Sequence, residues 1–495
     1  MPAIDLNVQP LTGEFDVCII GAGAAGITLA LELSDAGQRV LLCEGGGWAF
    51  SADSQDAYVG ELSGEEYFEL ITARMRYFGG TTNHWAGYCH PLQPVDFAPR
   101  TDLSVPSWPI AYSDIAPHYV RAGEIVGLPS DPWNYASLES TLGLPKLLGA
   151  ESGMESTAFR WPSEGKFRIL YLQNLTDREN VLLAMNSNLV DLEFAPGTNK
   201  VTAATVVNYS GDVYRAVADR YVIGCGGMEN AKLLLNIADG HYQFDSVAPS
   251  IGKYFMEHLC YYNSAFLLTG TEELAYLEPL TGRHNPEIGS YQWIGSPTAE
   301  ARAEHGIDTN VSITLDDTRF FAPDDILNDP ITKGVTSLLK GSEVSGSDQI
   351  IYCYVRAEQL PNPDSNITLT NDRDGQGLRR IKLNWSFDER DFPSMVRTVG
   401  LFAQTVAKQG LGRVAIRPPD RSTAFAKIVG GYHHMGSTRM SESPAHGVVD
   451  ANCRVHGIDN LYMAGSSVFS TGGWANPTIN VVAFAVRLAD HLRTI

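Results

Sequence analysis

The chain lacks long hydrophobic runs, an excess of basic residues and patterned cysteines, and each shortage excludes a class of protein. No run of about 18 apolar residues occurs among its 495 residues, so we expect no membrane-spanning helix. The formal net charge of −21 argues against nucleic acid or an anionic membrane surface as a partner. The 7 cysteines include no C-x-x-C pair, which favours reduced thiols over disulfides or a zinc site.

The N-terminal segment MPAIDLNVQPLTGEF has neither the basic region nor the apolar core of a secretory signal. Together with the unpatterned cysteines, this predicts a cytoplasmic protein. The hydrophobic fraction of 44% and the charged fraction of 19% are those of an ordinary globular protein. A chain of 495 residues exceeds what one core usually holds, which predicts two domains.

Residues 15–44 have the pattern of a complete β-α-β unit. They read FDVCIIGAGAAGITLALELSDAGQRVLLCE, which predicts a strand at 17–20, a helix at 24–36 and a second strand at 39–43. A first strand without polar residues is typical of a parallel sheet that is covered on both faces. The sequence therefore predicts an α/β dinucleotide-binding unit near the N-terminus.

Three glycines and one acid in this unit fit a dinucleotide. Gly21 allows the tight turn, Gly23 lets the backbone approach a pyrophosphate, and Gly26 lets the helix pack closely on the strand. The helix that begins at Ala24 points free N–H groups and its positive end at the anion. Glu44 can accept hydrogen bonds from ribose hydroxyls and would repel a 2′-phosphate, which disfavours NADP.

Later stretches predict a second nucleotide contact and a second sheet. Residues 224–235, GCGGMENAKLLL, again follow the order strand, glycine turn, helix. Residues 180–192 are predicted to form a strand, and alternating strands between 259 and 385 predict a mostly antiparallel sheet with one face free for a ligand. A polar insertion at 316–348 has no motif that we can assign. Pro477 suits the first position of a long closing helix.

Motifs at both ends of the chain give it a resemblance to a known family, the glucose-methanol-choline (GMC) oxidoreductases, which are flavoenzymes. Within this family it looks most like the bacterial sugar-oxidising branch of pyranose oxidases, glycoside 3-oxidases and the catalytic subunits of fructose and gluconate dehydrogenases. The motifs that carry the resemblance are the N-terminal fingerprint, GGTTNHW (79–85), WPIAYSDIAPHY (108–119), GGMENAKLLL (226–235), EQLPNPDSNITL (358–369), GYHHMGSTRM (431–440) and GGWANPTINVV (472–482).

The resemblance implies a fold that is α/β in its cofactor part and α+β overall. A Rossmann-like FAD-binding domain would comprise residues 1–90, 160–260 and 425–495. A substrate domain, built on a large and mainly antiparallel sheet, would comprise residues 91–159 and 261–424.

The resemblance also implies alcohol oxidation, in which a hydride leaves a carbinol carbon for flavin N5 and the hydroxyl proton goes to a base. The family motif H-x-x-G-x-x-R-M places the base at His433, and the family's paired Asn or His falls on Asn476. A histidine can act as base at neutral pH, and an amide can orient the substrate oxygen without competing for the proton. Adjacent side chains in an extended segment point in opposite directions, so we expect His434 to be a packed neighbour. No carboxylate or cysteine stands at ligand spacing, so we expect no metal.

Further FAD contacts are implied by the resemblance alone, in the glycine loop, on a strand and near the closing helix: Gly80, Thr81, Asn83, His84, Val190, Gly465, Ser466, Asn476 and Thr478. His84 aligns with the residue that is covalently bound to FAD in some pyranose oxidases, whereas many relatives bind FAD without such a bond. Trp474 and Gln359 are candidates for the substrate pocket. Glu257 and His258 match a recurring M-[DE]-H feature, to which we assign a structural role.

The leading hypothesis is an FAD-dependent oxidation of a sugar or glycoside secondary alcohol to a ketone, with His433 as base and O₂ or another acceptor to reoxidise the flavin. One alternative is the catalytic subunit of a fructose- or gluconate-type dehydrogenase complex. A different alternative is a flavin-binding protein without catalysis, or a lyase that uses the same fold. The substrate, its regiochemistry and the oligomeric state stay open at this point.

Overall fold

The structure is a computed structural model that describes residues 3–100, 103, 105–129, 132–285, 289–316, 350–388, 390–416 and 428–495. Apart from its first residue, the polar insertion at 316–348 lies outside these residues. Among the described residues, no helix combines the length and the apolarity that a bilayer crossing needs.

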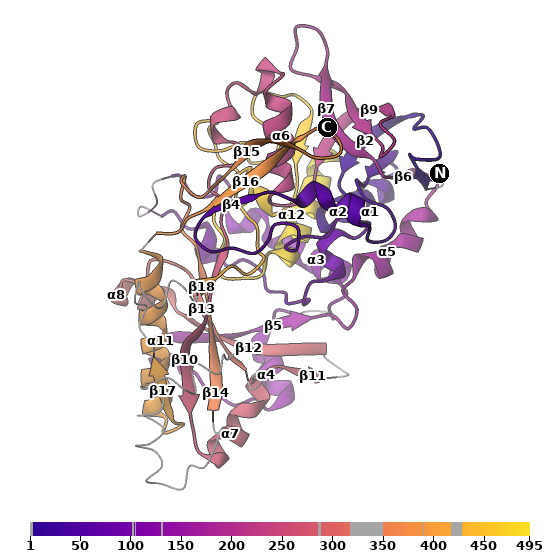
Figure 1. The fold of residues 1–495 in the computed structure, drawn as a ribbon. Helices are drawn as coiled ribbons and strands as arrows, with labels where there is room; N and C mark the ends of the chain where they lie inside the picture. The colour runs from indigo at the N-terminus through magenta and orange to yellow at the C-terminus, as the bar shows by residue number, and fades with distance from the viewer. Residues whose placement is uncertain are drawn as a thin grey trace.

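The first sheet is the one predicted from the β-α-β unit, and it occupies the upper part of the molecule in Figure 1. Its strand order is β1-β6-β3-β2-β9-β8-β7, with β19 also paired to β9. The pairs from β1 to β9 and the pair β9–β19 are parallel, whereas β8 and β7 add an antiparallel edge. The strands are β1 (Ile4–Asp5), β2 (Glu14–Ile20), β3 (Val40–Cys43), β6 (Val181–Met185), β7 (Asn188–Phe194), β8 (Val201–Val207), β9 (Val213–Ile223) and β19 (Leu461–Met463).

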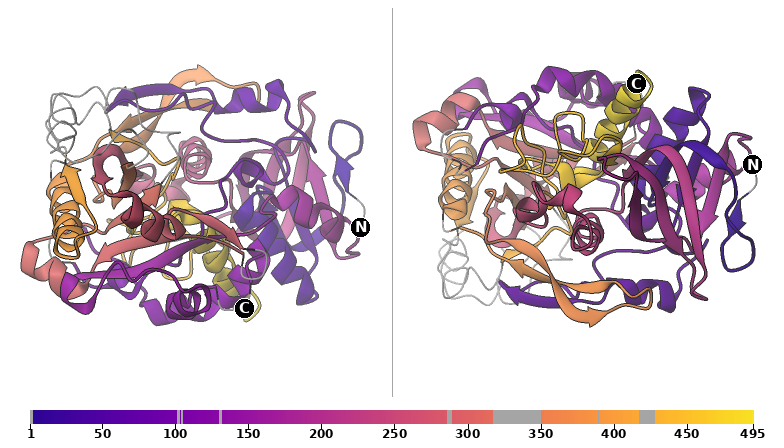
Figure 2. Two further views of the ribbon diagram at one scale, coloured as in Figure 1. Left: turned by 90° about the horizontal axis from the view of Figure 1, so that it is seen from below. Right: turned by 90° about the horizontal axis from the view of Figure 1, so that it is seen from above.

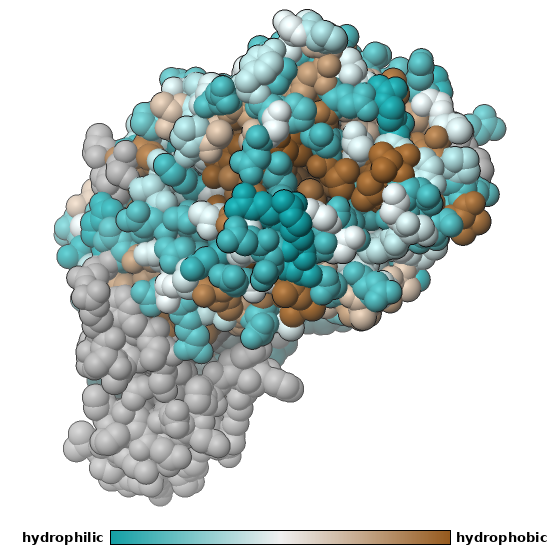
Figure 3. All heavy atoms as spheres, turned by 45° about the horizontal axis from the view of Figure 1, so that its top comes forward, coloured by the Kyte–Doolittle hydropathy of each residue, from teal (hydrophilic) through white to brown (hydrophobic). Residues whose placement is uncertain are grey.

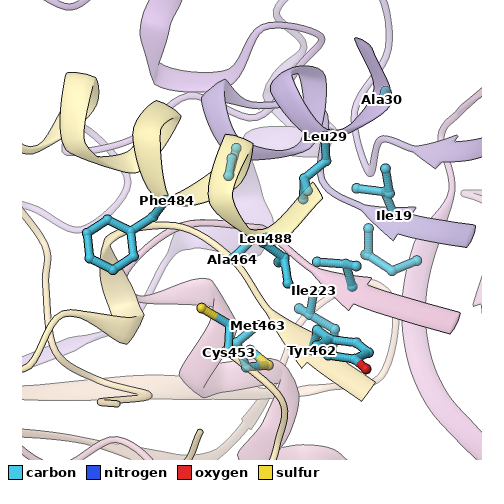
Figure 4. Close-up of a cluster of buried hydrophobic side chains, with 14 of the residues drawn as sticks. Ile19, Leu29, Ala30, Ile223, Cys453, Tyr462, Met463, Ala464, Phe484 and Leu488 are labelled. Atoms are coloured by element: carbon cyan, nitrogen blue, oxygen red, sulfur yellow. The ribbon is translucent and has the colours of Figure 1, made fainter. Parts of the chain in front are cut away.

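Two helices from opposite ends of the chain cover this sheet together. Helix α1 (Ala24–Asp35) follows the glycine turn, and α12 (Pro477–Leu492) packs against it. Figure 4 shows side chains of β2, β9, β19, α1 and α12 pointing into one cluster; Ile19, Ile223 and Leu488 are among them. These apolar segments are far apart in sequence, so burial of the parallel sheet requires the C-terminus as well as the N-terminus.

The second sheet lies below the first in Figure 1 and is antiparallel, as predicted. Its order is β11-β12-β13-β14-β10-β17, with β5 paired to β12 and β18 to β10. Helix α11 (Asp391–Lys408) packs on β12, β13 and β14. The strands are β5 (Met154–Trp161), β10 (His258–Leu268), β11 (Arg283–Asn285), β12 (Gly289–Pro297), β13 (Val311–Asp316), β14 (Ile350–Glu358), β17 (Arg413–Ile416) and β18 (Ile428–Val429).

Residues of alternate parity on β13 and β14 face opposite sides of this sheet. Val311, Ile313 and Val355 are buried in the core that α11 covers. Arg356, paired with Ser312, lies on the other face. This alternation leaves a polar face opposite the helix, as expected for a sheet that binds a ligand on one side.

A third, small sheet joins distant parts of the chain, because β4 (Glu61–Gly64) pairs in parallel with β16 (Arg379–Trp385), which pairs with β15 (Asn366–Arg373). The remaining α-helices of the described residues are short connections: α2 (Ala52–Gln55), α3 (Tyr119–Val126), α4 (Tyr135–Leu142), α5 (Phe167–Thr176), α6 (Glu229–Ala238), α7 (Thr271–Leu277) and α8 (Ala299–His305). Figure 2 shows the C-terminal segment, in yellow, lying among elements from the N-terminal half.

The division into two domains stays a prediction, and the packing of residues 91–159 bears on where its boundary runs. Leu92, Trp108 and Tyr119 are buried with the first sheet, whereas Leu138 and Ala158 are buried with the second.

On the face in Figure 3, apolar side chains stand in separate groups among hydrophilic ones, in keeping with the acidic composition.

Candidate functional site

A cavity opens at the carboxyl end of the first sheet. Its walls come from segments spread over the chain: the glycine turn after β2, the loop after β3, residues 73–82, the start of β7, residues 224–227, residues 465–466 and the start of α12. In an open parallel sheet this end is where ligands bind, because glycine turns and helix N-termini meet there. The predicted second contact at 224–235 thus joins the same cavity as the first.

The three fingerprint glycines differ in what surrounds them. A Cβ on Gly26 would lie 1.9 Å from the Gly21 carbonyl oxygen, and Gly21 itself has a φ of +102°. These two positions need glycine for the fold, because backbone occupies the space. A Cβ on Gly23 would meet nothing within 4 Å, and Gly23 lines the cavity. The space beside Gly23 is therefore available to a ligand.

Glu44 is buried at the end of β3 and also lines the cavity. Its carboxylate accepts hydrogen bonds from the backbone N–H groups of Ala22, at 3.0 Å, and Gly46, at 2.9 Å. A carboxylate has about four lone-pair positions, so each oxygen can accept another bond from a ribose hydroxyl. Glu44 thus fixes the glycine turn in place and keeps the acceptor capacity that a dinucleotide ribose needs.

Three residues that line the cavity have a buried polar atom with no hydrogen-bond partner among the described residues: Arg74 Nε, Ser187 Oγ and His434 Nε2. An unpaired buried polar group costs about 1–3 kcal/mol, so such atoms are usually satisfied by a ligand or water. Their presence here fits a large polar ligand such as FAD.

The two predicted catalytic residues lie beyond this cavity, on the side of the second sheet, and Arg356 of β14 acts on both of them. Arg356 Nη1 donates a hydrogen bond of 2.8 Å to Asn476 Oδ1. The positive charge of Arg356 also acts on the ring of His433. Neither His433 nor Asn476 lines this cavity, whereas the residues beside them, Tyr432 and Pro477, do.

His433 is held by a second histidine and by a buried carboxylate. Its Nδ1 lies 2.7 Å from Nδ1 of His258, and the Glu257 carboxylate accepts its backbone N–H at 2.9 Å. Burial lowers the pKa of His433 well below the ordinary 6.5, and His258 and Arg356 act in the same direction. The imidazole is therefore neutral and able to accept a proton.

The backbone that carries Asn476 is anchored by buried charged groups. The Gly473 N–H donates to Glu358 Oε1 at 3.3 Å, and the other oxygen of Glu358 forms an ion pair of 2.7 Å with Arg100. Arg439, fully buried, donates to the carbonyl oxygens of Ser470 and His446. Hydrogen bonds to charged groups contribute about 1.5–3 kcal/mol, which suits a segment that must hold a side chain in place.

Family profiles match both ends of the chain. A profile of the GMC oxidoreductases matches residues 361–485, and one of FAD dependent oxidoreductases matches residues 16–119. The chain belongs to the GMC oxidoreductase family.

The chain is similar over almost its full length to proteins of this kind. It is 24% identical to 2-methyl-1,2-propanediol dehydrogenase of Mycolicibacterium austroafricanum, over 97% of this chain and 95% of the relative. It is 22% identical to the fructose dehydrogenase large subunit of Gluconobacter japonicus, over 96% and 97%. Among solved structures, a formate oxidase of Aspergillus oryzae is 16% identical with a TM-score of 0.63, over 98% of this chain and 99% of that one. The fold predicted from the sequence is thereby confirmed.

This GMC oxidoreductase is an FAD-dependent enzyme that acts on CH–OH groups. When bound, FAD supplies the acceptor for the hydride that leaves the carbinol carbon. Gly23 leaves room for its pyrophosphate, Glu44 can hold its ribose, and the N-terminus of α12 offers N–H groups and positive dipole to an electron-rich ring.

The structure divides the FAD contacts expected from the GMC resemblance into two groups. Those that line the cavity are Gly80, Thr81, Gly465, Ser466 and Thr478. Asn83, His84, Val190 and Asn476 do not, although their neighbours Thr82, Leu189 and Pro477 do. His84 is exposed, and its Nε2 lies 3.2 Å from the Tyr77 hydroxyl.

The two candidates for the substrate pocket are buried. Gln359 is fully buried, and its amide accepts from the Glu257 N–H and Trp385 Nε1 and donates to the Ser386 carbonyl. Trp474 is 3% exposed and packs against His90, with ring centroids 4.6 Å apart. The structure thus brings neither side chain to the cavity, and Trp474 belongs to a small buried cluster with Phe159 and Ile294.

Two residues near the proposed catalytic pair of this GMC oxidoreductase are not among the site residues predicted from the sequence. For His258 the sequence predicts only a structural role, although the M-[DE]-H feature around it is a visible signal. Arg356 stands in strand β14 without a recognisable motif, and only the pairing of strands brings it to Asn476.

Proposed function

We propose that the protein oxidises a secondary alcohol of a sugar or glycoside to a ketone, with pyranose or C-glycoside 3-oxidation as the leading form. His433 takes the hydroxyl proton, Asn476 holds the alcohol oxygen, and the carbinol hydride goes to FAD. O₂ or another acceptor then reoxidises the cofactor. The observation that carries this proposal is that the guanidinium that binds Asn476 also lowers the pKa of His433, whose buried imidazole is neutral.

The contact with Arg356 supports a definite role for Asn476. A guanidinium has donors and no acceptor, so its partner on Asn476 must be the amide oxygen. The amide Nδ2 is then the group that can donate to a substrate oxygen. Donation to the oxygen as its proton leaves stabilises the negative charge that develops there.

A sugar is supported by the surroundings of this pair and by one relative. Tyr88 is half-buried and packs against Phe159, with ring centroids 5.4 Å apart, on the face of the second sheet that also carries Arg356. Aromatic faces pack against the apolar face of a pyranose, while polar groups bind its hydroxyls. The fructose dehydrogenase subunit, which matches along nearly its whole length, is named for a sugar.

The test is anaerobic mixing of the FAD-loaded protein with glucose, fructose, a C-glycoside and 1,2-propanediol. We expect a sugar to bleach the flavin band near about 450 nm within seconds to minutes. Bleaching by the diol alone would indicate that the substrate is a small alcohol and not a sugar, as the propanediol dehydrogenase relative favours. Failure of a broad sugar panel would contradict it.

The fructose dehydrogenase relative also favours a second candidate, the catalytic subunit of a dehydrogenase complex. Admitting air after bleaching separates the two. Rapid recovery of the flavin band with consumption of O₂ supports an oxidase, and a band that stays bleached until a quinone or dye is added supports a dehydrogenase.

We propose further that FAD is bound without a covalent bond. His84 is exposed, its Nε2 contacts the Tyr77 hydroxyl, and it does not line the cavity. Acid precipitation should therefore release all flavin into the supernatant. Yellow colour retained in the washed pellet would show that the bond exists.

A further inference from the structure

A second histidine stands directly behind His433. His258 begins strand β10 and is fully buried. Its Nδ1 lies 2.7 Å from Nδ1 of His433, with the two rings at 80° to each other. An N···N contact of this length is a hydrogen bond, so one of the two nitrogens carries a proton and the other does not.

The contacts of the other ring nitrogen of His258 show which of the two Nδ1 atoms carries the proton. Nε2 of His258 lies 2.9 Å from the carbonyl oxygen of Gly473 and 3.3 Å from that of Gly472. A carbonyl oxygen only accepts, so Nε2 carries a hydrogen and donates it. Burial, and then the charge of Arg356, lower the pKa of His258 to about 3, so the ring is neutral and its Nδ1 has a lone pair.

From this chain of hydrogen bonds we infer that His258 is a positioning residue that fixes the tautomer of His433. Because Nδ1 of His258 can only accept, Nδ1 of His433 must donate. In a neutral imidazole the remaining nitrogen, Nε2 of His433, is then unprotonated and presents its lone pair.

The neighbouring ionisable groups do not compete for this role. The Glu257 carboxylate accepts from backbone N–H groups of Gly431, His433 and His258 and from the Tyr67 hydroxyl. It therefore holds the backbone of both histidines and not the ring of His433. Arg356 has only donors and is bound to Asn476, so it cannot accept a proton from either ring.

The consequence for the reaction rests on the proposed function. The substrate O–H bond breaks, a bond from the proton to Nε2 of His433 forms, and the hydride leaves the carbon for FAD. His433 becomes an imidazolium whose Nδ1–H already donates to His258, so part of the new charge is stabilised without any rearrangement. The proton stays on Nε2 until it passes to solvent.

The test combines NMR of histidine nitrogens with kinetics on the FAD-loaded protein. Histidine-selective ¹⁵N labelling identifies the His433 signals by their loss in His433→Asn. We expect a protonated Nδ1 and an unprotonated Nε2 in the wild type. His258→Asn, whose amide oxygen replaces the Nδ1 acceptor, should keep this tautomer and most of the flavin reduction rate. His258→Leu should give a mixture of tautomers and a reduction rate at least about tenfold lower, with little change in substrate affinity.

Several outcomes would overturn the inference. One is a wild-type His433 protonated at Nε2, which needs no variant and no substrate. Another is a His258→Leu protein with the wild-type tautomer and rate. His241→Asn, a histidine change on the first-sheet side of the molecule, should alter neither readout. If no sugar reduces the flavin while the wild-type tautomer is as expected, the proposed function fails and the inference about His258 stands.

Discussion

At the scale of single residues, Arg356 and His258 take no part in the bond changes of the proposed reaction, but they orient the proposed catalytic pair. Arg356 turns the Asn476 amide so that its NH₂ is left for the substrate, and His258 does the equivalent for the His433 ring. Both contacts join strands of the second sheet to the C-terminal loops. The proposed reaction therefore depends on how the second sheet packs against the part of the molecule that contains the FAD cavity.

Replacing His433 by Asn should lower the rate constant of flavin reduction by about a hundredfold or more, because the reaction loses its base. FAD content and melting temperature should change little, since the side chain does not line the cofactor cavity. Anaerobic stopped-flow mixing measures the rate, with His241→Asn as the control. An unchanged rate would remove His433 from the mechanism.

The pH dependence of flavin reduction follows from the lowered pKa of His433. A base must be unprotonated to act, and a pKa well below 6.5 keeps it so at neutral and mildly acidic pH. Between about pH 8 and about pH 6 the rate constant should therefore show no titration of His433, and the neighbouring group that titrates there is Glu257, whose pKa burial raises to about 7. In Glu257→Gln, which removes that titration, a rate that halves near about pH 6.5 would indicate an ordinary, unshifted histidine.

The fixed charge of Arg356 predicts discrimination against cationic substrates. An ammonium group within several ångströms of the guanidinium is repelled by about 2–3 kcal/mol at an effective dielectric constant of about 20. Whichever neutral sugar is oxidised, its amino analogue should have a kcat/KM at least about tenfold lower. Arg356→Gln, which can still donate to Asn476, should bring the kcat/KM values of the neutral sugar and its amino analogue closer together. Arg215→Gln on the surface should leave the ratio of these two values unchanged. An amino sugar preferred by the wild type would contradict the argument.

At the scale of elements, different glycines of the β-α-β turn serve folding and cofactor binding. Gly26→Ala would put a methyl group 1.9 Å from backbone, so it should destabilise the apoprotein by about 1–3 kcal/mol. Gly23→Ala meets no protein atom, so it should fold normally and bind FAD at least about tenfold more weakly. Thermal melting and FAD titration distinguish them, with Gly149→Ala, which also meets nothing, as control. Equal loss of stability in both would refute this division of roles.

Local patterns predicted the elements that depend on local sequence. The apolar strand, glycine turn and helix of residues 17–36, and the helix starting at Pro477, are in the structure. The strand expected over 180–192 is two strands, because the chain turns at Asn186, whose φ is +55°. The pairing of β4 with β16 joins residues more than 300 positions apart and has no local signature.

The candidate site shows the same limit of sequence reasoning. His433 and Asn476 stand in motifs that the family resemblance marks, and the structure connects them through Arg356. His258 and Arg356 come from different strands, and only the antiparallel register of β10 and β14 brings both to the same place. Such a contact is a property of the folded sheet and cannot be read from a pattern within either strand.

At the scale of the whole molecule, FAD should stabilise the fold as one unit, because its cavity is built from segments between Ile20 and Val481. Excess FAD at about 100 times its Kd contributes about 2.7 kcal/mol to stability. We expect a single unfolding transition that moves to higher temperature with FAD and not with riboflavin, which lacks the pyrophosphate and adenosine. Gly23→Ala should abolish most of this shift. Independent melting of two parts would contradict it.

The position of α12 also has a consequence for shortened forms of the protein. Pro477, Thr478 and Val481 form part of the wall of the cavity, and α12 packs against α1. A polypeptide cut before Pro477 therefore loses one wall of its cofactor site and uncovers one side of α1. Such a fragment should be colourless after purification, whereas the 495-residue chain should be yellow.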